Sequence, residues 1–242
     1  MTIKTTATFP KEEGIYRALN KDYLIEDNEK YMNMYNRISY FYDFGEHWIG
    51  SLLFGSSLAQ LRTELMKELE WENNLSVLYV SIGTGYNLRY IPKNIDLQTL
   101  DFVGVDISLG MLKKCQKKMS SKTHLQLFHA CAEELPFADN SFDIVYHIGG
   151  INFFTDKQKA LSEMLRVAKP GVKILIADET SDYIEKQYKK SRITKKYFTD
   201  AQFDLQEIEQ AIPKTVQEKE TKLLRDNKFY SITFRKPLIS DL

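Results

Sequence analysis

The chain has 242 residues, 43% of them hydrophobic and 27% charged, and its 33 basic and 33 acidic side chains cancel. This is typical of one globular unit, and the balanced charge gives no reason to expect a nucleic-acid partner. No apolar run approaches the roughly 20 residues of a membrane span, and the N-terminus lacks the apolar stretch of a signal peptide. Cys115 and Cys131 form no CxxC pair. We therefore expect reduced thiols, no metal site and a cytoplasmic location.

Residues 1–50 differ in amino-acid composition from the rest of the chain. Seven aromatic residues fall between positions 31 and 48, with methionines and an isoleucine among them. They are Tyr31, Tyr35, Tyr40, Phe41, Tyr42, Phe44 and Trp48. This pattern predicts short helices that form either a packed layer or a lid over a substrate. We expect residues 1–50 to be this helical segment and residues 51–242 to be the main domain.

From residue 58 onward, short apolar runs alternate with helical patterns. The first pattern is a helix, because its leucines recur at helical spacing and form one apolar stripe. They are Leu58, Leu61, Leu65 and Leu69. The predicted strands cover residues 77–82, 101–106, 124–129, 142–148 and 172–178. Near the C-terminus, residues 219–236 predict an antiparallel hairpin about a turn at Asp226 and Asn227.

The predicted helices between and after these strands carry recognisable capping residues at their starts. The expected caps are Ser108, Thr155 with Gln158, and Thr199 with Gln202. Strands that alternate with helices predict a mostly parallel sheet covered on both faces. We therefore predict an α/β fold, a Rossmann-like doubly wound sheet of seven strands that ends in the antiparallel hairpin.

Ligands of an open α/β sheet bind outside the carboxyl ends of its strands, where the strand order reverses. Gly83, Thr84 and Gly85 follow the first strand there, and the two glycines let the backbone turn sharply near a ligand. A dinucleotide fingerprint would need a small residue at Leu88, so its bulk argues against a bound pyrophosphate. Asp106 ends the second strand, where a carboxylate can accept both hydroxyls of a ribose or simply start the next turn.

The loop after the third strand is a further part of the predicted site. Its backbone around Cys131 and Ala132 could meet the edge of an adenine, and His147 ends the fourth strand facing the same cleft. Together with the glycine turn and Asp106, these residues predict a site for a nucleoside without phosphates.

At these residues the chain resembles the class I S-adenosylmethionine (SAM)-dependent methyltransferases, over residues 34–180. The family's glycine motif, acid-x-G-x-G-x-G, is matched in its second half by residues 79–85. GVDIS resembles its ribose motif, and AEELPFADNSFDIVY and LRVAKPGVKILIAD resemble the segments that follow in the type 11 methyltransferases. YNRISYFYDF and GGINFFTDKQKAL resemble the quinone-ring C-methyltransferases of ubiquinone and menaquinone synthesis.

The resemblance implies SAM as cofactor, S-adenosylhomocysteine as product, and a small-molecule acceptor of an aromatic or quinone-like kind. It implies these cofactor-binding residues: Tyr42, Tyr79, Ser81, Gly83, Gly85, Asp106, Ile107, Met111, Cys131, Ala132 and His147. Ser81 stands in place of the motif's first glycine, and two further residues change a polar contact of the family. Tyr79 replaces an acid that helps to hold the ammonium of SAM, and Cys131 replaces an Asp that accepts from the adenine amino group. A neutral contact in place of a charged one predicts about tenfold weaker binding.

A methyl sulfonium is a strong electrophile, so the protein mainly has to align the nucleophile and exclude water. For a phenol or enol acceptor, His147 is the first candidate for a general base; the alternative is a strand-end histidine that contributes only its backbone. Tyr42 and Asp43 could close over the cofactor. Further aromatic residues would line an acceptor pocket or pack in the core: Tyr35, Tyr40, Phe41 and Trp48.

Three other functions stay open at this point. The altered Tyr79 and Cys131 are compatible with a SAM-binding protein that has a regulatory, non-methylating role. A nicotinamide dehydrogenase is disfavoured by Leu88, and nucleic-acid methylation is disfavoured by the absence of a basic groove.

Residues 186–196 carry six basic side chains. These side chains form either a solvated helix face or a surface for an anionic acceptor or a membrane. The sequence leaves a homodimer open.

Overall fold

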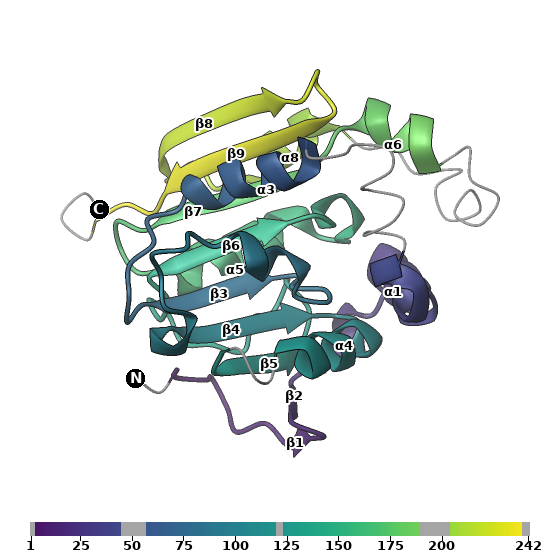
Figure 1. The fold of residues 1–242 in the computed structure, drawn as a ribbon, viewed down its shortest axis with the longest axis vertical. Helices are drawn as coiled ribbons and strands as arrows, with labels where there is room; N and C mark the ends of the chain where they lie inside the picture. Colours follow the sequence, from purple (N-terminus) through teal and green to yellow (C-terminus); the bar gives the residue numbers. More distant parts are fainter. Residues whose placement is uncertain (1–2, 45–56, 120–122, 189–203, 239–242) are drawn as a thin grey trace.

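The computed structural model describes residues 3–44, 57–119, 123–188 and 204–238. Its strands form one mixed sheet in the order β1-β2-β5-β4-β3-β6-β7-β9-β8 (Figure 1). The strands are β1 Lys11–Glu12, β2 Ile15–Arg17, β3 Ser76–Val80, β4 Asp101–Asp106, β5 Leu125–His129, β6 Ile144–Ile148, β7 Lys173–Glu179, β8 Gln217–Leu224 and β9 Phe229–Arg235. The α-helices are α1 Glu26–Phe44, α3 Ser57–Lys67, α4 Leu109–Met119, α5 Lys157–Val167, α6 Ser181–Tyr188 and α8 Leu205–Ala211.

The strand order confirms the doubly wound topology. β3 pairs in parallel with β4 on one side and β6 on the other, and β5 and β7 continue the parallel sheet outward. β9 runs antiparallel to β7 and pairs with β8 in the predicted terminal hairpin. The order therefore reverses between β3 and β6, and ligands of such sheets bind at the carboxyl ends of these two strands.

The described sheet has nine strands where the sequence predicted seven. The two additional strands are β1 and β2, in a segment that we expected to be helical. β2 lies parallel to β5, where Ile15 is fully buried and Tyr16 stacks on Phe128 at 4.5 Å. Strands of two and three residues are too short to show an alternating pattern, so tertiary pairing decides their conformation.

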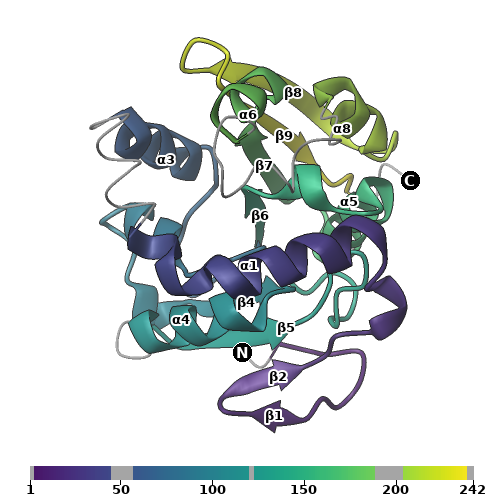
Figure 2. The same cartoon turned by 90° about the vertical axis from the view of Figure 1, so that its right-hand side faces the viewer.

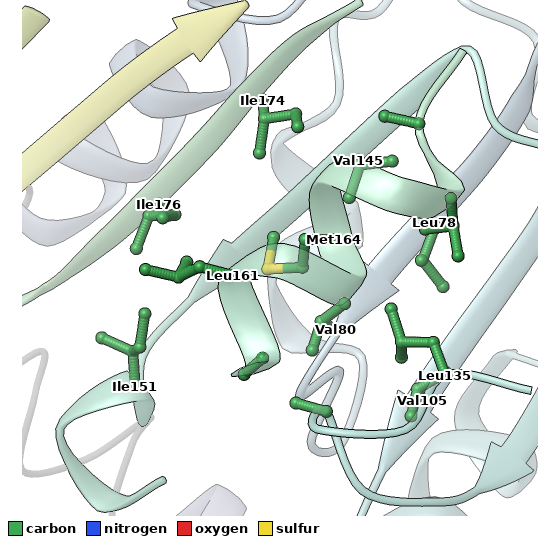
Figure 3. Close-up of a cluster of buried hydrophobic side chains, with 14 of the residues drawn as sticks. Leu78, Val80, Val105, Leu135, Val145, Ile151, Leu161, Met164, Ile174 and Ile176 are labelled. Carbon is green, nitrogen blue, oxygen red and sulfur yellow. The ribbon is translucent and has the colours of Figure 1, made fainter. Parts of the chain in front are cut away.

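Helices cover both faces of the sheet. Apolar side chains of α5 and α8 bury one face together with alternate residues of β3, β6 and β7. Figure 3 shows Leu161 and Met164 of α5 over Val145, Ile174 and Ile176. The other face packs against α3 and α4. Fully burying a side chain of this size stabilises the fold by about 1.5–3 kcal/mol, so these two layers fix the strands that carry the site.

The capping residues were predicted correctly for α4 and wrongly for α5. The hydroxyl of Ser108 accepts the backbone N–H of Met111, as expected of an N-cap. α5 is capped by Asp156, whose carboxylate accepts from the N–H of Lys159 at 2.8 Å. Thr155, the predicted cap, instead accepts the backbone N–H of Asn28 in α1. A long-range contact has therefore taken the hydroxyl that the local pattern assigned to the helix.

The cap of α8 also differs from the prediction. Thr199 and Gln202 lie outside the described residues, and α8 begins only after Asp204. The carboxylate of Asp204 accepts the backbone N–H of Gln206 at 2.8 Å. In the described parts of the chain, no helix is long and apolar enough to span a membrane.

The connection from β3 to β4 contains no α-helix. It holds two short 3-10 helices, Tyr86–Tyr90 and Leu97–Thr99. Parallel strands are usually joined through an α-helix that covers the sheet. Here α3, which precedes β3, covers this face through Leu61 and Leu65.

Helix α1 lies at the carboxyl ends of the central strands. Figure 2 shows it running across this end of the sheet, and it contacts α4 and the short turn Ile151–Phe153. The rings of Tyr31 and Phe153 pack against each other at a tilt of 31°, with their centres 4.3 Å apart, and Ile184 of α6 joins this small cluster. The helix thus covers the carboxyl ends of the central strands, where a ligand is expected.

Candidate functional site

The turn after β3 places three alternate residues in the left-handed region. The φ angles are 59° at Ser81, 58° at Gly83 and 73° at Gly85. A Cβ atom on Gly83 would meet no atom within 4 Å, whereas one on Gly85 would lie 2.8 Å from the sulfur of Cys115. Gly83 therefore faces open space, and Gly85 is required for packing against α4.

Asp106 ends β4 directly beside this turn. Its two carboxylate oxygens accept the backbone N–H groups of Gly83 and Ser108, each at 2.8 Å. The side chain is buried, and this burial raises its pKa to about 6 against the opposing effect of the two hydrogen bonds. Each carboxylate oxygen keeps a further lone pair. Asp106 can therefore accept additional hydroxyl donors while it holds the turn in place.

A small cavity opens beside Asp106 at the carboxyl ends of β3, β4 and β5. Its volume is about 20 Å³, roughly the space of a single water molecule. A nucleoside therefore enters only if the residues above the cavity move. The lining residues are Asn28, Val80, Ser81, Val105, Asp106, Ile107, Ala130, Ala132, Glu133 and Phe154.

Two asparagines of α1 fasten this helix over the cavity. The Asn28 amide donates to the carboxylate of Glu133 at 2.8 Å and to the carbonyl of Tyr23 at 3.0 Å. Near the other end, the Asn36 amide oxygen accepts from the hydroxyl of Ser108 at 2.7 Å and from the N–H of Gly110 at 3.1 Å. The first contact lies over the loop after β5, and the second lies over the start of α4.

Glu133 is an almost fully buried carboxylate in the cavity wall. Burial raises its pKa, against the opposing hydrogen bonds from Asn28 and from the backbone N–H of Asp156. The sequence predicts its neighbours Cys131 and Ala132 as site residues but not Glu133. The segment AEELPF carried the relevant signal, whereas the partner Asn28 lies 105 positions away and left no local signal.

Of the other predicted cofactor residues, Ile107 and Ala132 line the cavity. Cys131 is buried beside it, and burial raises the pKa of its thiol to about 12, so the thiol stays protonated. Met111 packs in the first turn of α4 and is buried. Neither Cys131 nor Met111 forms part of the cavity wall.

Tyr79 points away from the cavity, into the core beneath α3 and α4. Its ring stacks on Tyr146 at 4.3 Å. Its hydroxyl donates to the carbonyl of Ile148 at 3.3 Å and accepts from the amide of Asn87 at 2.7 Å. The hydroxyl thus joins the segment after the glycine turn to the end of β6.

His147 is fully buried at the end of β6. Its Nδ1 lies 3.1 Å from the carbonyl of Val80, which can only accept, so Nδ1 carries the proton. Nε2 is then an acceptor, and it has no partner in the described part of the chain. Burial lowers the pKa of His147 to about 4. The ring meets Phe154 edge-on at 5.2 Å and so lies just behind the cavity wall.

Several predicted residues lie wholly or partly outside the described structure. Position 42 belongs to α1, but the side chain of Tyr42 is not described, and the same holds for Tyr40, Phe41 and Asp43. Trp48 and residues 189–196 of the basic segment are not described either. Tyr35 is placed near Phe153, with ring centres 6.3 Å apart. Burial raises its pKa well above the usual value, and nearby Asp178 adds to this.

A larger groove of about 610 Å³ lies elsewhere, between the N-terminal segment and α5. The Arg166 guanidinium in its wall is bound by Glu163 and Asp139 and by two backbone carbonyls. None of the residues that line this groove belongs to β3 or β6, between which the strand order reverses, so its volume does not make it the primary candidate.

Comparison with known proteins places these features in context. The profile of a family described as "Methyltransferase domain" matches residues 78–176. A ubiquinone/menaquinone biosynthesis C-methyltransferase of Geotalea daltonii is 31% identical over 159 residues, which cover 64% of this chain and 65% of that protein. The chain thus spans just under two thirds of that relative.

Two solved structures share the fold. A SAM-dependent methyltransferase of Thermotoga maritima, described as a possible histamine N-methyltransferase, has a TM-score of 0.60 at 22% identity, covering 84% of this chain and 99% of that one. The [4+2]-cyclase SpnF also has a TM-score of 0.60, at 15% identity, covering 76% and 83%. At these identities the likeness shows the architecture alone.

Proposed function

We propose that the chain is a class I SAM-dependent methyltransferase that binds SAM at the strand ends and transfers a methyl group to a small-molecule acceptor. The observation that carries the proposal is Asp106. It is a buried carboxylate held by two backbone N–H groups at 2.8 Å, beside a glycine turn with open space above Gly83. An acid at this point of a doubly wound sheet suits the two hydroxyls of a ribose.

The lining residues suggest how the cofactor lies. The ribose would meet Asp106, and the adenine would lie between Ile107 and Ala132 in the cavity. The methionine end would then extend past Gly83 toward the end of β6. When bound, SAM supplies an electrophilic methyl group. Because the cavity is small, α1 has to shift at Asn28 before a nucleoside enters.

We infer an aromatic or quinone-like acceptor. The aromatic side chains of Tyr31, Tyr35 and Phe153 cluster between α1 and the end of β6, where they could hold a planar ring and exclude water. The name of the Geotalea daltonii relative supports the quinone-like class. His147 has no partner at Nε2 in the described part of the chain, so this atom is the candidate acceptor for the proton of a phenol or enol. Burial lowers the pKa of His147 to about 4, which keeps the ring neutral at pH 7 but makes it a weak base.

Calorimetric titration of the whole chain with SAM and S-adenosylhomocysteine tests the cofactor. Methyl-labelled SAM with a panel of phenols and hydroquinones then tests the transfer. We expect micromolar binding of both nucleosides and label in an extractable product. His147→Gln should lower the transfer rate and leave SAM binding within about twofold. Failure of both nucleosides to bind would contradict the proposal.

A second candidate is a SAM-binding protein that does not transfer methyl groups. Tyr79 and Cys131, which depart from the family pattern, motivate it, and the cyclase among the fold neighbours indicates that this architecture is not confined to methyltransferases. Tight binding of SAM without label transfer to any acceptor class would favour this candidate.

A further inference from the structure

Asn87 presents a buried acceptor that the protein itself does not satisfy. The residue is 8% exposed, and its Oδ1 has no hydrogen-bond partner in the described part of the chain. An unpaired buried amide oxygen costs about 1–3 kcal/mol, so a bound water, an ion or a ligand is expected to complete its hydrogen bonding. Asn87 belongs to neither the predicted site nor the cavity wall.

The orientation of this amide is fixed by Tyr79. The Tyr79 hydroxyl gives its proton to the carbonyl of Ile148, so it can only accept from Asn87. The Asn87 Nδ2 is therefore the atom that faces the hydroxyl, at 2.7 Å, and Oδ1 is the atom left over. Tyr79 thus determines which atom of the Asn87 amide, Nδ2 or Oδ1, faces its hydroxyl.

The position of Asn87 also matches one end of the proposed cofactor. The residue lies two positions beyond Gly85, and its chain of hydrogen bonds ends at Ile148, the last residue of β6. The adenosine part of SAM is assigned to Asp106 and the loop after β5. The region between the glycine turn and the end of β6 is therefore left for the methionine part.

Of the groups on the methionine part, the ammonium is the one that donates hydrogen bonds, whereas the carboxylate only accepts them. We propose that Asn87 Oδ1 receives the ammonium of SAM and that Tyr79 acts as its positioning residue. A neutral amide oxygen held by a tyrosine then replaces the acid that the glycine motif lacks at position 79. This inference rests on the proposed function, since it needs SAM as the ligand.

The test compares ligands with and without the ammonium. SAM and S-adenosylhomocysteine carry it, whereas 5′-methylthioadenosine keeps the adenosine part and lacks it. Calorimetry on the whole chain would use wild type, Asn87→Ala, Asn87→Asp and Tyr79→Phe. Asn94→Ala is the matched control, because Asn94 is exposed on the same β3–β4 connection. Binding of 5′-methylthioadenosine reports directly that a variant is folded.

We expect Asn87→Ala to weaken SAM and S-adenosylhomocysteine about tenfold and to leave 5′-methylthioadenosine within twofold. Tyr79→Phe should weaken the two ammonium ligands by a smaller factor, about threefold, because the amide loses its orientation. Asn87→Asp should tighten them at pH 8 and lose this gain as the new carboxylate is protonated at lower pH.

Equal weakening of all three ligands would overturn the inference, because Asn87 would then merely shape the turn. Unchanged binding of all three ligands would overturn it as well. If wild type binds 5′-methylthioadenosine but neither ammonium ligand, the methionine part is not accommodated and the inference fails. If wild type binds none of the three, the proposed function itself has failed.

Discussion

Replacing Asp106 with alanine separates a ligand-binding carboxylate from a structural one. Its two hydrogen bonds from Gly83 and Ser108 stabilise the turn, but the rise of its pKa from 3.8 to about 6 shows that the site disfavours the charged form. That rise corresponds to about 3 kcal/mol. This net cost of the charged form already includes both hydrogen bonds, and it is relieved when the carboxylate is removed, whereas the N–H groups of Gly83 and Ser108 then lose their acceptor. Because these effects oppose each other, we expect Asp106→Ala to change the free energy of unfolding by less than about 2 kcal/mol.

Binding should respond much more strongly than stability. Two ribose hydroxyls lose an anionic acceptor, which is worth roughly 2–3 kcal/mol, or about 30–150-fold in Kd. The assay is calorimetric titration with SAM and 5′-methylthioadenosine, which share the ribose and should lose the same factor. Asp101→Ala, at the opposite end of β4, is the control and should bind like wild type. A folded Asp106→Ala protein with wild-type affinity would refute the ribose assignment.

Three further predictions follow from the same site. The affinity for 5′-methylthioadenosine should be nearly full above about pH 7, about half of that near pH 6 and up to about tenfold lower by pH 5, as Asp106 with its pKa of about 6 becomes protonated; a flat profile would contradict this. Asn28→Ala should lower the free energy of unfolding in urea by about 1–3 kcal/mol, because Glu133 loses a buried donor, and should speed hydrogen exchange in α1. Exchange there should slow when SAM binds wild type. Both Gly83→Ala and Gly85→Ala place a Cβ at a positive φ and should destabilise the protein by about 1 kcal/mol, Gly85→Ala by more because its Cβ also meets the sulfur of Cys115. Gly83→Ala should in addition weaken nucleoside binding, and thermal unfolding with calorimetry separates the two effects.

The central strands could be predicted to within about two residues because their signal is local. β3, β4 and β6 are buried on both faces, so each appears in the sequence as a continuous apolar run closed by a polar or glycine residue. The position of Asp106 follows from that boundary. The cap of α4 was equally accessible, because Ser108 and its partner Met111 lie three residues apart.

The contacts that hold α1 over the cavity could not be predicted in the same way. Asn28 meets Glu133 and Thr155 across 105 and 127 positions of the chain, and no periodicity connects them. These contacts also explain the wrong cap of α5. The orientation of Tyr79 depends on strand pairing, because only the pairing with β6 puts Tyr146 beside its ring.

The helix-free connection from β3 to β4 has a consequence for the charge that the site accepts. A long helix after the glycine turn would direct about half a positive charge at the ligand, which suits phosphates. The segment Tyr86–Tyr90 is a single short 3-10 helix, with few aligned peptide dipoles. A dinucleotide pyrophosphate would therefore find little compensation there, whereas a sulfonium and an ammonium meet little repulsion. Because the helix dipole at the glycine turn is weak, we expect the site to favour cationic nucleosides over nicotinamide cofactors.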